Sequence, residues 1–261
     1  MKRLVFCLCS AALLTLPPAG RVAADDDVAD VLSQDLRAGK DDNKRYFLIG
    51  PGKDVKEPKK GFGLLIVMPG GPGDEKFHPF VKRIAKNALS ETYLVAQPVA
   101  VKWTEKQQTV WPTDKNRVEK MKFTTEEFVA AVIDDVEARH KLNPQHVFTL
   151  SWSSSGPAAY PVSLTNQRVT GSFIAMSVFR PDWMPPLEKA KGHAYYLFHS
   201  PDDTVCPYRD AQYAEEELKK NAAKVWLADY DGGHGWHGDV FENIRRGVEW
   251  LEKNHAEPPG K

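Results

Sequence analysis

Residues 146–156 read His146-Val-Phe-Thr-Leu-Ser-Trp-Ser-Ser-Ser-Gly156, an apolar stretch that runs into a series of small residues. This pattern predicts a buried strand that turns sharply into a helix. A serine at such a turn needs small residues two positions before it and two positions after it, because the backbone is crowded there. Ser153 has Ser151 and Ser155 at these positions, whereas Ser154 would place the bulky Trp152 in one of them. We therefore expect Ser153 at the turn.

Short apolar segments alternate with longer amphipathic segments on both sides of this stretch. The predicted strands cover residues 63–68, 92–97, 145–150, 171–177, 193–199 and 224–230, and the predicted helices cover 76–89, 125–142, 207–221 and 240–254. Strands that alternate with helices form a mostly parallel sheet with helices on both faces. Ligands bind outside the carboxyl ends of the strands in such a sheet. The expected fold class is therefore α/β, with the site at that edge.

Three other segments are harder to assign. We expect a short helix over residues 28–36 and an edge strand over residues 45–49. The connection 99–123 has no clear period and is longer than a loop needs to be, which is typical of functional or disordered segments. Because it follows the carboxyl end of a predicted strand, we expect it to form a rim over the site. Its Trp103 and Trp111 then either contact substrate or fasten the loop to the body of the protein.

A glycine-rich turn ends the strand in Leu64-Leu-Ile-Val-Met-Pro-Gly-Gly-Pro-Gly73. This segment resembles the oxyanion loop of the α/β-hydrolase superfamily, and the turn at Ser153 is similar to its Gly-x-Ser-x-Gly nucleophile elbow. The resemblance implies that N–H groups of Gly71, or Gly70, and of Ser154 stabilise an oxyanion. The chain departs from the family pattern because serines replace both elbow glycines and Pro69 replaces the usual histidine. A phosphate-binding loop is the alternative, but no Gly-Lys-Ser/Thr follows.

The segment Tyr195-Tyr-Leu-Phe-His-Ser-Pro-Asp-Asp-Thr-Val-Cys-Pro207 resembles the part of the same fold that carries the catalytic acid. Alignment on its last proline implies that Asp203 is the acid, which holds a catalytic imidazole in the correct tautomer. The adjacent Asp202 is the alternative, and is otherwise a turn or cap residue. We expect His199 to be a structural hydrogen-bonding histidine.

The segment Val225-Trp-Leu-Ala-Asp-Tyr-Asp-Gly-Gly-His-Gly-Trp236 is similar to the loop that carries the general base in secreted esterases of this fold. The resemblance implies that His234 is the base, because histidine can accept and return a proton near neutral pH. His237 is the alternative. We expect no metal site, since the spacing of these histidines matches no established zinc motif.

The N-terminal residues 1–24 have the layout of a secretory signal peptide, with two cations, a short apolar run and small residues before position 25. We expect cleavage after Ala24 and a single mature domain of residues 25–261 that is secreted or periplasmic, without a stable membrane anchor. Cleavage removes two of the three cysteines. The remaining Cys206 is expected to be a small packed side chain in an oxidising compartment.

The 35 basic residues balance 35 acidic residues, which gives a formal net charge of zero and no whole-chain attraction to nucleic acid. The resemblance implies a secreted esterase of the phospholipase/carboxylesterase or polyester-depolymerase branch, with the triad Ser153, Asp203 and His234 and without a cofactor. The substrate would be a small or polymer-linked ester, contacted by Trp103, Trp111 and Trp152. A serine peptidase related to prolyl oligopeptidase and a non-catalytic binding protein are the alternatives, and the oligomeric state stays open.

Overall fold

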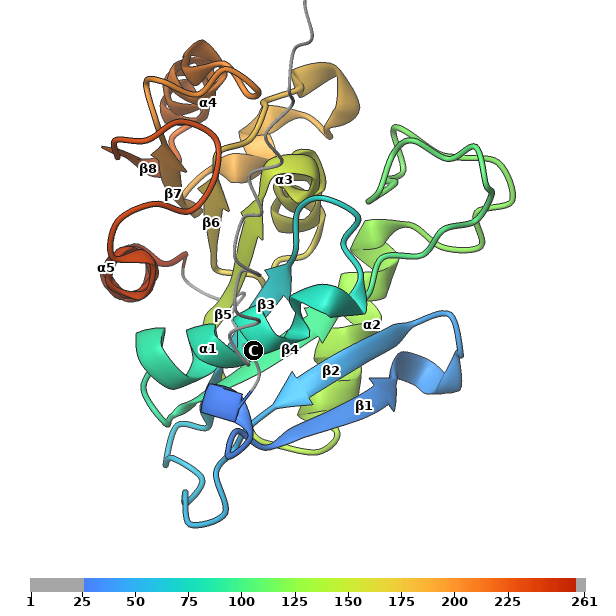
Figure 1. The fold of residues 1–261 in the computed structure, drawn as a ribbon. Coiled ribbons are helices and arrows are strands. Elements are labelled where there is room, and N and C mark those ends of the chain that lie inside the picture. Colours follow the sequence, from blue (N-terminus) through green and yellow to red (C-terminus); the bar gives the residue numbers. More distant parts are fainter. Residues whose placement is uncertain (1–25, 257–261) are drawn as a thin grey trace, which may run out of the picture.

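The structure is a computed structural model that describes residues 26–256. Its eight-stranded sheet has the order β1-β2-β4-β3-β5-β6-β7-β8 (Figure 1). The strands are β1 (Ser33–Arg37), β2 (Arg45–Ile49), β3 (Phe62–Met68), β4 (Tyr93–Pro98), β5 (Leu142–Trp152), β6 (Gly171–Ala175), β7 (Ala194–His199) and β8 (Lys224–Asp229). β2 pairs antiparallel with β1 and β4, and the pairs from β4 to β8 are parallel. The carboxyl ends of these parallel strands therefore lie at one edge of the sheet.

Helices cover both faces of the sheet (Figure 1). They are α1 (His78–Ala88), α2 (Thr125–Glu137), α3 (Gly156–Thr165), α4 (Tyr208–Lys220) and α5 (Val240–Asn254). Successive side chains of a strand point to opposite faces. Leu65 and Val67 of β3 accordingly pack with α1 and α5, whereas Leu64 and Ile66 pack with α2 and α3 on the other face. Both halves of the core are thus formed by strands that are apolar on both faces, as the sequence predicts for a parallel sheet.

The prediction of a helix over residues 28–36 is wrong. The chain forms a 3₁₀ turn at Asp26–Val28 and then the edge strand β1. The side chain of Asp35 accepts hydrogen bonds from Arg45 of the neighbouring strand, and the strand pairs with β2 along its length. An isolated helix of two turns is marginal in water, so pairing with a partner strand decides the structure of this segment.

The predicted helix 125–142 is too long at its C-terminal end. α2 begins with a capping box between Thr124 and Glu127 and ends at Glu137, and β5 already begins at Leu142. Leu142 pairs with Phe62 ahead of a register shift in the ladder between β3 and β5. The sheet therefore takes up residues that the helical period alone assigns to the helix.

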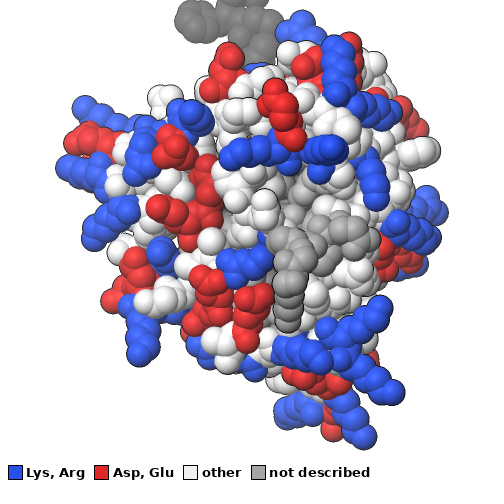
Figure 2. Space-filling model, turned by 180° about the vertical axis from the view of Figure 1, so that it is seen from behind, with Lys and Arg blue, Asp and Glu red and all other residues white. Residues whose placement is uncertain are grey.

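The predicted signal peptide, residues 1–24, lies outside the described residues. Within residues 26–256, no helix combines the length and the apolar character that crossing a bilayer requires. Acidic and basic side chains are interspersed over most of the face seen in Figure 2. The neutral net charge is thus not separated into large patches of one sign on this face.

Gly247 of α5 allows the helix to approach the sheet closely. A Cβ atom at this position would lie 2.3 Å from the ring of Phe173 and 2.9 Å from the ring of Tyr196. Alanine favours a helix over glycine by about 1 kcal/mol, but overpacking a core costs about 1–3 kcal/mol. Because the Cβ atom would overlap two buried rings, the cost falls at the upper end of this range, and we expect Gly247→Ala to lower the free energy of unfolding in urea by about 2 kcal/mol.

The matched control is Glu249→Ala, since Glu249 is exposed on the same helix. Its free energy of unfolding should stay within about 0.5 kcal/mol of the wild-type value. A Gly247→Ala variant as stable as the wild type would contradict the close approach of α5.

Candidate active site

Ser153 lies directly after β5, at the start of a one-turn 3₁₀ helix that leads into α3. Its backbone φ is +54°, in the left-handed region that residues other than glycine rarely adopt. A residue is held in such a conformation only when its surroundings determine it, and such residues cluster at functional sites. The sharp turn predicted at Ser153 is therefore present, at the carboxyl edge of the sheet.

The serines that replace the usual glycines fit the turn through their own hydrogen bonds. Ser155 is fully buried, and its hydroxyl accepts from the Trp152 N–H at 3.0 Å and donates to the Met68 carbonyl at 2.6 Å. Ser177 donates to the carbonyl of Ser153 at 2.7 Å. At the next position only glycine fits, because a Cβ on Gly156 would lie 2.0 Å from the Ser177 hydroxyl. These bonds tie the turn to the end of β3 and to the loop after β6.

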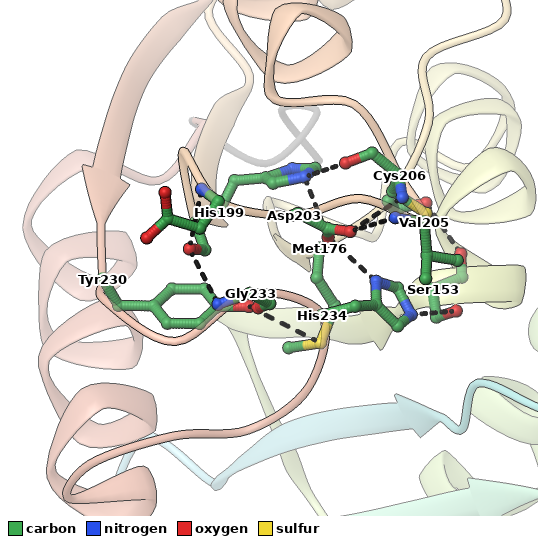
Figure 3. Close-up of polar contacts among 12 residues, drawn as sticks. Ser153, Met176, His199, Asp203, Val205, Cys206, Tyr230, Gly233 and His234 are labelled. Atoms are coloured by element: carbon green, nitrogen blue, oxygen red, sulfur yellow. Dashed lines mark hydrogen bonds and ion pairs between the residues drawn. The ribbon is translucent and has the colours of Figure 1, made fainter.

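The structure brings Ser153, His234 and Asp203 together in one chain of hydrogen bonds (Figure 3). The Ser153 Oγ lies 3.0 Å from His234 Nε2, and His234 Nδ1 lies 2.8 Å from Asp203 Oδ2. A carboxylate accepts hydrogen bonds, so Nδ1 carries the imidazole proton and Nε2 is free to accept the hydroxyl proton. Three residues that follow three different strands thus have the arrangement of a nucleophile, a base and an orienting acid.

Asp203 is almost completely buried, with 6% of the residue exposed. Its Oδ1 accepts the backbone N–H groups of Val205 and Cys206, each at 2.8 Å. Burial alone would raise the pKa of this carboxyl, but the hydrogen bonds from His234 and from these two N–H groups lower it below its ordinary value. Asp203 is therefore an anion at neutral pH. The adjacent Asp202 is exposed, and within the described residues its carboxylate accepts no hydrogen bond.

His199 lies on the other side of Asp203 (Figure 3). Its Nε2 is 2.8 Å from the carbonyl of Cys206 and 3.2 Å from Asp203 Oδ2, and its side chain is buried. The ring is thus a hydrogen-bonding histidine, as the sequence predicts. No local pattern indicates that this ring also fastens the turn of Asp203.

The loop that carries His234 is fixed by two residues that sequence reasoning missed. Ser200 accepts the Gly233 N–H at 3.1 Å, and the Tyr230 hydroxyl donates to the Gly233 carbonyl at 2.9 Å. A small polar residue directly after a strand was a usable signal for Ser200, but Tyr230 could not be recognised without the fold. His237, the alternative base, is exposed and stacks on Tyr230.

The glycine-rich turn lies against the residue after Ser153. The Ser154 hydroxyl donates to the Gly71 carbonyl at 2.8 Å, and Gly71 has a φ of +55°. Within residues 26–256, the Gly71 N–H has no protein acceptor, and the Ser154 N–H is at the start of a helix, where such groups lack intrahelical partners. Gly71 and Ser154 thus offer two N–H groups beside Ser153. Pro69, which replaces the usual histidine, accepts the indole N–H of Trp111 at 3.0 Å.

The three tryptophans proposed as substrate contacts are mostly structural in this conformation. Trp111 is only 3% exposed and fastens the connection 99–123 to the glycine-rich turn. Trp103 packs its ring edge-on against Phe123, with centroids 4.9 Å apart. Trp152 is 5% exposed and packs among the rings of Phe77, Phe80 and Trp236. The burial of Trp111 favours the alternative that it fastens the loop to the body of the protein, and substrate contact by these tryptophans stays a prediction.

Metal-ligating side chains come together at one place in the described chain. One ligand atom each of Asp203, Cys206 and His234 lies within 4.8 Å of the other two. Cys206 is 7% exposed. Its burial, and to a smaller extent the negative charge of the nearby Asp203, raise the pKa of its thiol to about 11. A thiol that stays protonated is a poor nucleophile, so Cys206 does not rival Ser153.

No protein-family model and no curated protein matches this sequence. Similar solved structures include a thermostable esterase from Pseudomonas putida ECU1011, with 11% identity and a TM-score of 0.63 over 87% of this chain and 84% of that one. A carboxylesterase from Mesorhizobium loti has 19% identity and a TM-score of 0.61 over 84% and 98% of the two chains. A truncated carbohydrate esterase from gut microbiota has 12% identity and a TM-score of 0.64 over 85% and 96%. At these identities the likeness establishes the fold, and it confirms the sequence-based prediction: this chain has the α/β-hydrolase fold.

Proposed function

We propose that this protein is a serine hydrolase that cleaves carboxylic esters through an acyl-enzyme intermediate. The observation that carries the proposal is the continuous chain of hydrogen bonds from Ser153 through His234 to Asp203. The left-handed backbone at Ser153 supports it, because strain of this kind is typical of functional residues. The esterases and carboxylesterases among structures of the same fold favour an ester over other acyl substrates.

The proposed reaction has two halves. Ser153 attacks the ester carbonyl while His234 Nε2 takes its proton, and the resulting imidazolium is stabilised by the carboxylate of Asp203. The oxyanion is held by the N–H groups of Gly71 and Ser154. His234 then gives the proton to the departing alcohol, and it activates a water molecule that releases the acid from Ser153.

The part of the substrate remote from the ester bond is proposed to lie beside Pro72, which directly follows Gly71. A cavity of about 190 Å³ separates Pro72 from the connection 99–123. It is lined by Ala100, Val101, Lys102, Gln107, Thr109 and Val110. A cavity of this size accepts a small, largely apolar group, and residues 100–110 line it together with Pro72.

The finer expectation that the protein is exported also stays a proposal. It rests on the signal-peptide layout of residues 1–24. An esterase outside the cytoplasm would meet small or polymer-linked esters before they enter the cell.

Replacement of the proposed nucleophile tests the reaction type. We expect Ser153→Ala to lower kcat on p-nitrophenyl acetate by about 10⁴-fold or more, because only binding and the oxyanion-stabilising groups remain. The Cβ atom is retained, so the thermal melting curve should change little. Ser90→Ala, an exposed serine at the opposite edge of the sheet, is the control and should keep full activity. Substantial hydrolysis by folded Ser153→Ala protein would rule out this nucleophile.

The two adjacent aspartates test the identity of the acid. Asp203→Asn should lower kcat by about 10⁴-fold, because an amide can stabilise the wrong tautomer of the catalytic imidazole. Asp202→Asn should cost less than about tenfold, since an exposed turn residue does not contact the base. Both kcat values would be measured on the same ester. A larger loss of kcat in Asp202→Asn than in Asp203→Asn would show that Asp203 is not the acid.

A further inference from the structure

The thiol of Cys206 faces the proposed acid and base without taking part in their hydrogen bonds. Its sulfur lies within 4.8 Å of a carboxylate oxygen of Asp203 and a ring nitrogen of His234. The residue is 7% exposed, yet its thiol makes no hydrogen bond to any part of the chain between residues 26 and 256. The proposed reaction does not use this sulfur, and its lone pairs are left free for a ligand.

The position of this sulfur is fixed by the same contacts that hold the acid. Asp203 Oδ1 accepts the N–H of Cys206, and His199 Nε2 donates to the carbonyl of Cys206. Both backbone groups of Cys206 are thus anchored, with the sulfur turned toward Asp203 and His234 (Figure 3). The three side chains are held in place before any ligand arrives.

We propose that Asp203, Cys206 and His234 form an inhibitory site for a Zn²⁺ ion. Thiolate, imidazole and carboxylate are the ligands that zinc takes in proteins. Tetrahedral bonds of about 2.0–2.3 Å require ligand atoms about 3.3–3.8 Å apart. The present separations are at most 4.8 Å, so small side-chain movements bring all three atoms to the ion. Water supplies the fourth ligand from the side of His234, whose side chain is 22% exposed.

Zinc at this site stops the proposed reaction by changing the tautomer of the base. Nδ1 is the ring nitrogen that faces Asp203, and the ion binds it through its lone pair. The proton that Nδ1 carried must then sit on Nε2, where it blocks acceptance of the Ser153 proton. The Cys206 thiol loses its proton to solvent on binding. One proton is therefore released for each ion bound, and no bond to Ser153 changes.

The metal site itself does not depend on catalysis, whereas its inhibitory effect rests on the proposed function. Binding and inhibition are accordingly measured separately. Zn²⁺ is titrated into the metal-free protein by calorimetry, and the hydrolysis of p-nitrophenyl acetate is followed over the same range of Zn²⁺ concentrations. Each variant is compared with its own metal-free rate.

We expect wild-type protein to bind one Zn²⁺ ion. At about 100 µM Zn²⁺ its rate of p-nitrophenyl acetate hydrolysis should fall at least tenfold. EDTA should restore the rate, and Mg²⁺, which prefers oxygen ligands, should have no effect. Cys206→Ala and Cys206→Ser should each weaken zinc binding and inhibition by at least tenfold. His237→Ala, which removes the exposed neighbouring imidazole, should leave both unchanged. Thermal melting curves verify that each variant is folded.

Equal inhibition of the wild type and of the two folded Cys206 variants would overturn the proposal. So would zinc binding at Cys206 that leaves the hydrolysis rate unaffected, because the ion would then not control the base. If the wild-type protein binds zinc through Cys206 but hydrolyses no ester, the metal site is supported and the proposed function is refuted.

Discussion

The left-handed turn at Ser153 is the constraint on which the rest of the site depends. A non-glycine residue in a sparsely populated backbone conformation costs about 1–3 kcal/mol, so neighbouring groups must hold it there. Ser155 bridges Trp152 and Met68, and Ser177 binds the carbonyl of Ser153. The turn is consequently tied to the ends of two flanking strands. This arrangement places the hydroxyl at the carboxyl edge of the sheet, where it meets the loop of His234.

Parallel strands bring the remaining groups to the same edge, but strand order alone does not fix their distances. Each loop is held by a neighbour: the glycine-rich turn by Trp111, the acid turn by His199, and the base loop by Ser200. These contacts orient the side chains of the proposed triad. A site built in this way has little reorganisation left to make during the proposed reaction. The same contacts explain why the buried Cys206, in the turn of Asp203, lies close to both Asp203 and His234.

Sequence reasoning predicted the parts that depend on local pattern. Short-range information is enough to predict the apolar strands and the helix α5. It is also enough to select Ser153 over Ser154, because the crowding at the turn involves only residues two positions away. The structure has the strands, the helix and the turn at the predicted positions. The edge strand β1 was missed because its structure comes from pairing with β2, which no local period records. Trp111 was open to two interpretations because its partner, the carbonyl of Pro69, is 42 residues away. The turn that holds Cys206 is shaped by the nearby Asp203 and His199, but its proximity to His234 depends on a contact between residues 31 positions apart.

The central claim is that Ser153 is a nucleophile activated by His234. The most direct test is to treat the wild-type protein with a fluorophosphonate and to locate the adduct by mass spectrometry of proteolytic peptides. The account predicts one phosphonylated residue, Ser153, with labelling slowed strongly in the His234→Ala variant because the base no longer removes the hydroxyl proton. Folded wild-type protein that stays unlabelled, or that is labelled on a different residue, would contradict it.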